Sequence, residues 1–458
     1  MPNFDNIPKV KTTITDGNLR IVPEPTTPKV TLLGTTNNTT ISLLEPTRVV
    51  GSVRVSDFDL NSGKPSELSR AIQECQDAGA DNIEVMIISR TTGANDGGAL
   101  TADARWAALD TAYALLLDHP TDIVVPVGAY IDAALSSSNS YGYQLANYCF
   151  QATKSFDATI GVIATTKPVD HTTDDGLASI SLTAMSNWVT NLAAFNTATG
   201  QGANFTIFDG VTDANTDGVP DNYGFWATTD EAIPSGSPRA SDADVVDDQN
   251  GNPTDLGPYI SVVAGLYRFR NQVATKQDPA NKAYDSTGEA AYAGLIAGLA
   301  PHIPPTNKII SGPSVIRNLS LSQADTLCGK RFVVFRDKAG VTKVVNGMTG
   351  AYNISSTFRS DFVRLSTVRI VHDAIDRVRA VADPFIGQPN NGVNIQALRA
   401  EIDQTLGRLQ ELGALRRYEF KIVATPAMQV LGQVTVNITL VPAFEITEIT
   451  QNIALAKE

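Results

Sequence analysis

The sequence has little of the residue types from which metal sites and motif-bearing enzymes are built. Its 458 residues include three widely spaced cysteines, Cys75, Cys149 and Cys328, and only four histidines. No CxxC, HxH or HExxH pattern occurs, which argues against a zinc site and against a disulfide framework. The GxxxxGK[ST] phosphate loop and the GxSxG nucleophile elbow are also absent. No catalytic site is therefore predicted, although these absences do not exclude one assembled from scattered residues.

Long apolar runs and an excess of positive charge are missing as well. The longest apolar runs, AYALLL and AGLIAGLA, are much shorter than a segment that crosses a bilayer and have the length typical of buried core segments. The net charge of −13 disfavours direct binding to nucleic acid or to an anionic membrane. Residues 346–458 hold 11 basic and 11 acidic residues, so the whole acidic excess lies in residues 1–345. This asymmetry predicts a neutral module attached to an acidic body.

Helix-like and strand-like segments alternate through residues 28–165. Apolar runs typical of buried strands occur at 29–35, 82–89, 122–127 and 158–165, and helical patterns separate them. The first helical pattern begins after Ser66, a good N-cap, and ends at Gly79. Such regular alternation predicts an α/β body with a mostly parallel sheet.

Residues 209–257 interrupt this pattern as an acidic surface insertion. They carry 11 acidic residues and one basic residue, Arg239. Within them, Asp213, Asn215, Asp217 and Asp221 alternate around a Gly turn, as the oxygen ligands of Ca²⁺ often do. Gly224 stands where an EF-hand has its final glutamate, so a solvated acidic loop with Asx turns is the alternative. A structural Ca²⁺ is the only metal predicted, and no other cofactor is expected.

Two amphipathic helices and a strand pair form the C-terminal module. The helices are expected to end near Ala382, before Asp383-Pro384, and at Gly413. Residues 433–440 alternate between apolar and polar side chains, which is typical of a half-buried strand, and Pro442 is expected to interrupt it. Few strands on two helices make a thin α+β sheet whose open edges need a partner.

Residues 350–415, with the turn FIGQPN, and residues 434–449 together resemble the C-terminal domain of the contractile tail sheath proteins of bacteriophages. The segments AGADNIEVMIISR, DIVVPVGAY and PYISVVAGLYRF resemble the α/β domain of that family, which is similar to a subtilisin-type fold. The resemblance implies an N-terminal arm (1–27), a body (28–345, with the insertion 209–257), an assembly domain (346–441) and a C-terminal arm (442–458).

In that family, each of the two arms adds a strand to the sheet of a neighbouring subunit, a mode of binding called β-augmentation. The added strands pair with the open edges of the sheet. The implied inter-subunit strand residues are Val10, Ile14, Leu19, Ile21, Val434, Val436, Ile438, Leu440, Phe444, Ile446 and Ile449. The implied tube-facing residues, on the first C-terminal helix, are Arg359, Arg364, Arg369, Arg377 and Arg379. For these arginines a solvated helix face paired with Asp361, Asp373 and Asp376 is the alternative.

The resemblance implies a structural subunit rather than an enzyme. Such a subunit polymerises with itself as stacked hexameric rings around a tail tube protein, bounded by baseplate and tail terminator proteins. It contracts to drive the tube through the host envelope and belongs to the virion tail, assembled in the host cytoplasm. No nucleic acid partner and no membrane insertion are implied. The alternatives are the sheath of a phage-like bacteriocin and, more remotely, a hydrolase with a subtilisin-type domain.

Overall fold

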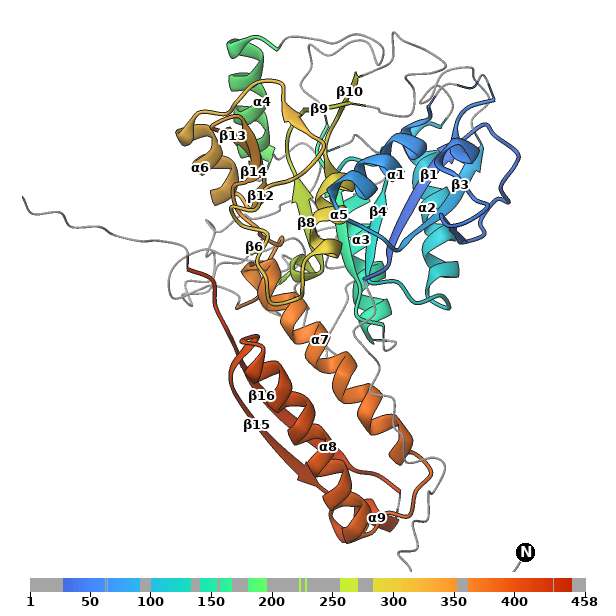
Figure 1. Ribbon diagram of the computed structural model, residues 1–458, viewed down its shortest axis with the longest axis vertical. Helices are drawn as coiled ribbons and strands as arrows, with labels where there is room; N and C mark the ends of the chain where they lie inside the picture. The colour runs from blue at the N-terminus through green and yellow to red at the C-terminus, as the bar shows by residue number, and fades with distance from the viewer. Residues whose placement is uncertain are drawn as a thin grey trace, which may run out of the picture.

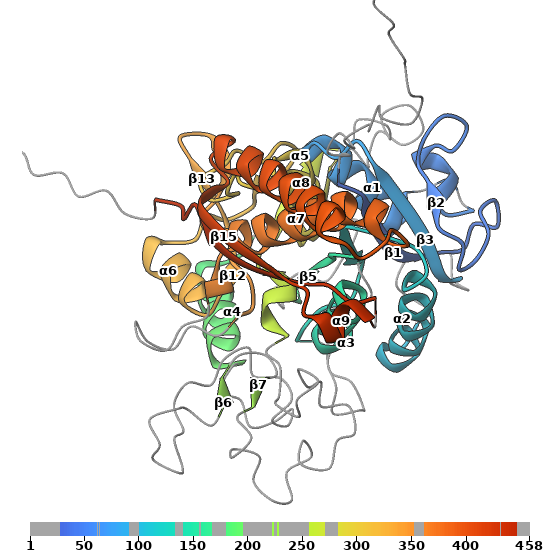
Figure 2. The same cartoon turned by 90° about the horizontal axis from the view of Figure 1, so that it is seen from below.

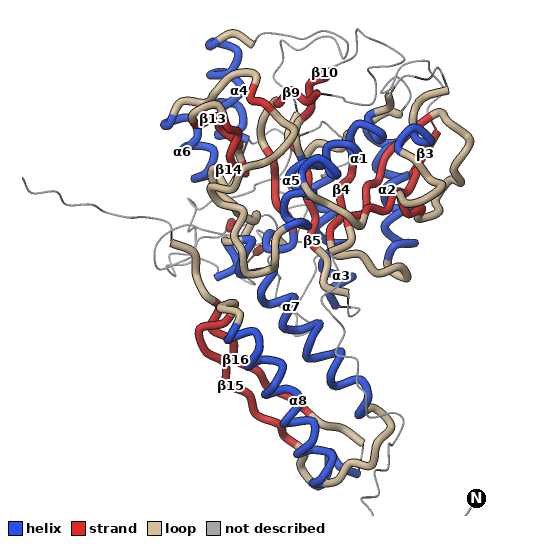
Figure 3. The backbone as a smooth tube through the Cα atoms, viewed as in Figure 1, coloured by secondary structure: helices blue, strands red, loops and turns tan. Residues whose placement is uncertain are grey.

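The computed structural model describes residues 28–61, 63, 65–90, 100–132, 141–154, 157–166, 180–195, 222–223, 227–228, 256–270, 283–351, 361–430 and 432–446. These residues form an α/β body from which a narrower lobe projects along the long axis of the molecule (Figure 1). The body is built around one sheet, and the lobe is built from the last two long helices and a β-hairpin (Figure 3). Seen from below, the lobe lies across the body, with α7 and α8 side by side (Figure 2).

A seven-stranded sheet forms the centre of the body, in the order β12-β8-β5-β4-β1-β3-β2. All neighbours pair in parallel except β2 and β3, which pair antiparallel. The parallel strands read as near-continuous apolar runs because helices cover both faces of the sheet. The strands are β1 (Val30–Thr36), β2 (Thr47–Arg48), β3 (Ile83–Arg90), β4 (Ile123–Pro126), β5 (Ile160–Ala164), β8 (Ile260–Val263) and β12 (Phe332–Val333). The predicted mostly parallel α/β body is confirmed.

One cluster of buried residues joins the sheet to α1 (Glu67–Ala78) and α5 (Glu289–Gly298), and a second joins it to α2 (Ala102–Leu116), α3 (Tyr141–Lys154), α4 (Leu182–Phe195) and α6 (Leu321–Gly329). Helix α1 begins where expected, because the Ser66 hydroxyl accepts a hydrogen bond from the Ser69 amide. It ends at Gly79, whose φ of 117° lies in the left-handed region that favours glycine.

Shorter elements complete the body. A three-stranded antiparallel sheet joins β10 (Ala283–Ser286), β9 (Tyr267–Arg270) and β11 (Ser314–Val315). Two hairpins follow the same pattern, β13 (Phe335–Lys338) with β14 (Val341–Val344) and β6 (Asn222–Tyr223) with β7 (Ala227–Thr228). The 3₁₀ turns are η1 (Val55–Phe58), η2 (Gly257–Tyr259), η4 (Asp361–Val363) and η5 (Asp383–Phe385).

The lobe consists of α7 (Leu365–Ala382), α8 (Gly392–Glu411), β15 (Leu415–Val423), α9 (Pro426–Val430) and β16 (Thr435–Pro442). Its separate core is centred on Ile402, Leu406 and Leu409 of α8, which are at most 1% exposed. Asn391 caps α8, and Gly413 follows it with a φ of 78°, as expected. One expectation is wrong: Pro442 belongs to β16 rather than interrupting it. A proline is tolerated there because β16 is an edge strand.

Candidate assembly interface

The hairpin β15–β16 carries an apolar side and a polar side. Its antiparallel register places Tyr418 opposite Leu440, Phe420 opposite Ile438, and Ile422 opposite Val436. All six side chains lie against the core of the lobe, whereas their neighbours in sequence, such as Glu419 and Thr439, are exposed. The period of two that the sequence predicts is therefore confirmed as a two-faced hairpin.

Both edges of this hairpin are open within the part of the chain that the structure describes. The sheet there has two strands, and a two-stranded hairpin on its own is only marginally stable in water. An open edge presents unpaired backbone N–H and C=O groups to any strand that arrives. Val436, Ile438 and Leu440 of β16 pack against the core of the lobe, and Val434, which is 37% exposed, precedes β16.

The remaining strand candidates follow the hairpin or lie outside the described residues. Phe444 and Ile446 come directly after β16 and are 62% and 79% exposed, although both are large and apolar. Val10, Ile14, Leu19, Ile21 and Ile449 lie outside the described residues. Which segment completes the sheet therefore stays a prediction.

A buried ion pair holds the chain after β16 to the start of α7. Glu445 Oε1 lies 2.9 Å from Arg364 Nη1, and the two side chains are 5% and 17% exposed. Arg364 also contacts the Asn346 side chain, and the Ala443 amide donates to the Ala414 carbonyl. These contacts fix residues 443–446 at the end of the lobe next to the body (Figure 1).

The predicted tube-facing arginines fall into different environments. Arg369 is 6% exposed, and its Nη2 donates to the Leu299 carbonyl at 2.5 Å. Arg364 and Arg369 therefore make contacts within the subunit, and the position of this helix face relative to a tube stays a prediction. Arg377 pairs with Asp373 at 2.8 Å, and Arg379 Nη1 lies 4.0 Å from Asp376, which matches the alternative of a paired helix face. Arg359 lies outside the described residues.

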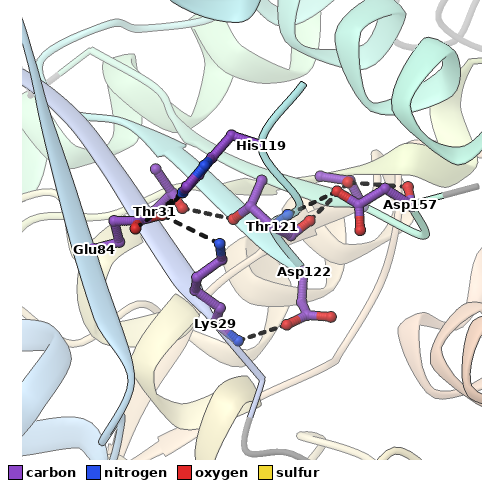
Figure 4. A network of polar contacts seen from close by, with 8 residues as sticks. Lys29, Thr31, Glu84, His119, Thr121, Asp122 and Asp157 are labelled. Carbon is purple, nitrogen blue, oxygen red and sulfur yellow. Dashed lines mark hydrogen bonds and ion pairs between the residues drawn. The ribbon is translucent and has the colours of Figure 1, made fainter. Parts of the chain in front are cut away.

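A polar network occupies the amino ends of the central strands (Figure 4). The Lys29 amide donates to Asp122 at 2.6 Å, and the Thr121 amide donates to Asp157 at 2.7 Å. Glu84 lies 3.3 Å from Lys29 Nζ and 3.1 Å from His119 Nε2. Burial raises the pKa of both Asp122 and Asp157.

Helix α7 brings two further titratable groups to this edge. Burial raises the pKa of Asp376 to about 7; Arg379 opposes the shift, while Asp122, Asp157 and Asp373 add to it. Burial, helped by the Arg379 charge, lowers the pKa of His372 to about 4, and the imidazole lies 6.4 Å from the Tyr259 ring. The His372 side chain therefore lies between α7 and η2.

Replacing Asp376 by asparagine is expected to stabilise the protein above pH 7. The pKa of Asp376 is about 7 in the folded chain and near 4 in the unfolded chain. Such a carboxyl contributes its full stability to the fold below pH 4, where it is protonated in both states. That contribution is lost as the pH rises through about 7, where the carboxyl ionises in the folded chain. The asparagine amide mimics the protonated carboxyl, so D376N should exceed the wild type in stability at pH 8 and match it near pH 4. We expect D376N to raise the free energy of unfolding at pH 8 by about 1 kcal/mol or less. The effect is small because the Asp376 side chain is 45% exposed, so solvent screens its charge.

Thermal denaturation of both proteins at several pH values between 4 and 8 measures this difference. An equal difference at every pH would show that Asp376 acts through packing rather than through its charge. D118N is the matched control, because Asp118 lies outside this network. It should leave the pH dependence of the melting temperature unaltered.

The carboxyl ends of the same strands carry a second polar cluster. A small cavity of about 40 Å³ lies between the start of α1, the end of β4 and the start of α5, lined by Glu67, Arg70, Glu74, Gly128, Asp285 and Glu289 among others. A Cβ at Gly128 would lie 2.5 Å from Arg105 Nη1 and 2.7 Å from Glu67 Oε2. Charged side chains thus fill this end of the sheet and pack onto the backbone.

The described residues contain no group of three or more His, Cys, Asp or Glu side chains that could hold a metal ion. The four predicted Ca²⁺ ligands, Asp213, Asn215, Asp217 and Asp221, lie outside those residues. No helix in the described part of the chain is long and apolar enough to span a membrane.

Comparison with known proteins gives a match at the level of structure. No protein family model matches the sequence, and no curated protein matches it. A chain of the contracted sheath complex of an extracellular contractile injection system, PVC, superposes with a TM-score of 0.56 at 12% identity, covering 99% of both chains. A chain of the anti-feeding prophage baseplate gives 0.51 at 12% identity, covering 98% of this chain and all of the other.

The sheath tail protein of Desulfitobacterium hafniense gives a TM-score of 0.50 at 8% identity, covering 95% of this chain and all of the other. These matches extend over the body and the lobe together, so the likeness concerns the whole chain rather than a common α/β core. The chain therefore has a mixed α/β fold shared with proteins of contractile injection systems.

Proposed function

We propose that this chain, which has the fold of contractile injection system proteins, is the structural subunit of a contractile tail sheath. It polymerises as stacked hexameric rings around a tail tube and contracts to drive the tube through the envelope of a host cell. The observation that carries the proposal is the projecting lobe, whose hairpin is open at both edges among the described residues and packed on one face only.

The geometry supports polymerisation through the lobe. An arriving strand would satisfy the backbone groups of an open edge, and alternate side chains would set its register. Strand addition would join neighbouring copies through backbone hydrogen bonds at the lobe, so each body could turn without the copies separating. The Arg364–Glu445 pair supports this arrangement, since it fixes the point from which the C-terminal tether departs.

The partners follow from this role. They are further copies of this chain, a tail tube protein inside the rings, and baseplate and tail terminator proteins at the two ends. The subunit needs no catalytic site, because the free energy of contraction comes from apolar surface that becomes buried when the subunits repack. The working location is the tail of a virion, assembled in the host cytoplasm. The subtilisin-type likeness of the body and a structural Ca²⁺ in the insertion are finer parts of the same proposal.

Electron microscopy of the purified full-length chain tests the proposal. We expect hollow tubes with six-fold symmetry, either spontaneously or after addition of the tube protein. A monomer that forms no ordered polymer at high protein concentration, with or without tube protein, would contradict it. The sheath of a phage-like bacteriocin is the nearest alternative, and capsid genes beside this gene would decide against it.

A further inference from the structure

Positive charge is concentrated in one stretch of the acidic body. Residues 299–351 contain seven basic residues and two acidic ones, although the chain as a whole has a net charge of −13. Two strands of this stretch, β13 and β14, form a hairpin whose turn residues, Ala339 and Gly340, both have positive φ. A two-residue turn of this kind fixes the register of the strands, and with it the face on which each side chain lies.

One face of this hairpin collects three of the positive charges. Arg336 lies directly opposite Lys343 in the antiparallel register, and Lys338, two residues along β13, shares their face. Side chains on the other face, such as Phe335 and Val344, are buried in the core of the body. Arg336, Lys338 and Lys343 therefore form a basic face on the outer side of the hairpin.

No acidic side chain among the described residues balances the basic face. Lys338 and Lys343 form no ion pair there, and Arg336 donates through Nε to a backbone carbonyl at 2.9 Å. Asp337, the acidic residue of the hairpin, lies on the other face, where its Oδ1 accepts from an amide of the turn at 2.8 Å. Like charges directly opposite each other destabilise a pair of strands. This arrangement weakens the fold and is the one expected of a site that binds an anionic partner.

The acidic insertion contains a segment that complements this face. Residues 242–248, with the sequence DADVVDD, place four aspartates around Val245 and Val246. Ile309 pairs with Lys343 in the same small sheet and is 57% exposed, so an apolar side chain accompanies the three cations. Opposite charges that flank an apolar contact on both partners give the complementarity of a specific interface.

The position of the insertion favours a contact between two copies. Its described hairpin, β6–β7, lies on the other side of α4 from β13 (Figure 2). The described part of the insertion is therefore distant from the basic face of its own molecule. We propose that residues 242–248 of one copy bind the basic face of the next copy, through ion pairs with Arg336, Lys338 and Lys343. The inference rests on the proposed polymerisation and specifies a contact between bodies, separate from strand addition at the lobe.

Fluorescence anisotropy with a labelled synthetic peptide of residues 240–250 tests this contact on the full-length chain, at a concentration too low for polymerisation. We expect the peptide to bind the wild type, and its affinity to fall as NaCl is raised from about 50 mM to about 500 mM, because salt screens exposed charges. K343E should weaken binding about tenfold. A peptide with asparagine in place of its four aspartates should not bind.

R48E is the matched control for K343E. Arg48 is exposed on β2, at the edge of the central sheet farthest from β12, and its replacement changes the net charge by the same amount. It should leave the affinity for the peptide unaltered.

The stability of K343E provides a second readout. The substitution removes the like-charge pair with Arg336, so the melting temperature should rise by about 1–2 °C although the variant binds the peptide more weakly. A lysine with a structural role alone would lose stability on replacement and leave peptide binding unchanged.

Equal affinity of K343E and the wild type for the peptide would overturn the proposal. Tighter binding of a single-stranded oligonucleotide than of the peptide would also overturn it, because the basic face would then be a nucleic-acid site. Tubes from a wild type that does not bind the peptide would remove this contact and leave the sheath proposal standing. Peptide binding by a chain that forms no tubes would support the contact and contradict the sheath proposal.

Discussion

A chain truncated after Pro442 is expected to remain folded but to form no tubes. The cut leaves β15, β16 and the core of the lobe complete, because the last residue of β16 is Pro442. It removes Phe444, Ile446 and the segment 447–458, which are proposed to complete the hairpin of a neighbouring copy. Loss of polymer should therefore be complete, since the remaining open edges have no partner strand from this end. Electron microscopy and light scattering measure the outcome.

A second truncation, after Ile446, distinguishes a loss of assembly from a loss of stability. This variant keeps the pair between Glu445 and Arg364, so it should melt at the temperature of the full chain. The shorter variant leaves Arg364 without its carboxylate partner and should melt a few degrees lower. Neither should form regular tubes. Regular tubes from the chain ending at Pro442 would contradict strand exchange through the C-terminal segment.

Replacing Gly294 by alanine is expected to be among the most destabilising single changes in the body. Gly294 lies on α5 where that helix crosses α1, and a Cβ there would lie 2.2 Å from the Cys75 carbonyl oxygen. The next contacts, at 2.9 Å, are also backbone atoms of Cys75, so no side chain can rotate away. One helix must move, at a cost of roughly 3 kcal/mol or more. Chemical denaturation measures the free energy of unfolding.

Gly407→Ala is the matched control for that experiment. Gly407 lies inside α8, and its Cβ would meet only the Tyr418 hydroxyl, at 3.5 Å, which is an ordinary contact. Alanine is favoured over glycine inside a helix by about 1 kcal/mol. The same substitution should therefore stabilise the lobe and destabilise the body. Equal effects at the two positions would contradict the close crossing of α1 and α5.

The spacing of apolar residues predicted secondary structure correctly in segments where the spacing is regular. The alternation in residues 433–440 predicts a strand with Val436, Ile438 and Leu440 on one side, and β16 has that form. The helical spacing before Asp383-Pro384 predicts the end of α7. These features depend on side chains that are neighbours in sequence, so their periods can be read without knowing the rest of the fold.

The role of single charged residues could not be read in the same way. Arg364, Arg369 and Arg377 look alike along one helix, yet Arg364 pairs with Glu445, Arg369 bonds Leu299, and only Arg377 pairs within the helix. The partners of the first two lie 81 and 70 residues away in sequence. A groove of about 280 Å³ in the lobe is likewise formed by segments distant in the chain, the turn between α7 and α8 and the residues just before β16.

The sequence by itself determined the alternating body, the two amphipathic helices and the two-faced strand at the carboxyl end, because the period of apolar side chains specifies which face of each element is buried. Only the tertiary structure decided which charges are buried, how the segment after β16 is anchored, and that an apolar groove and exposed Phe444 lie at opposite ends of one lobe. Those features depend on how distant segments are juxtaposed, and burial and partner geometry are properties of the packed chain rather than of any local stretch of it.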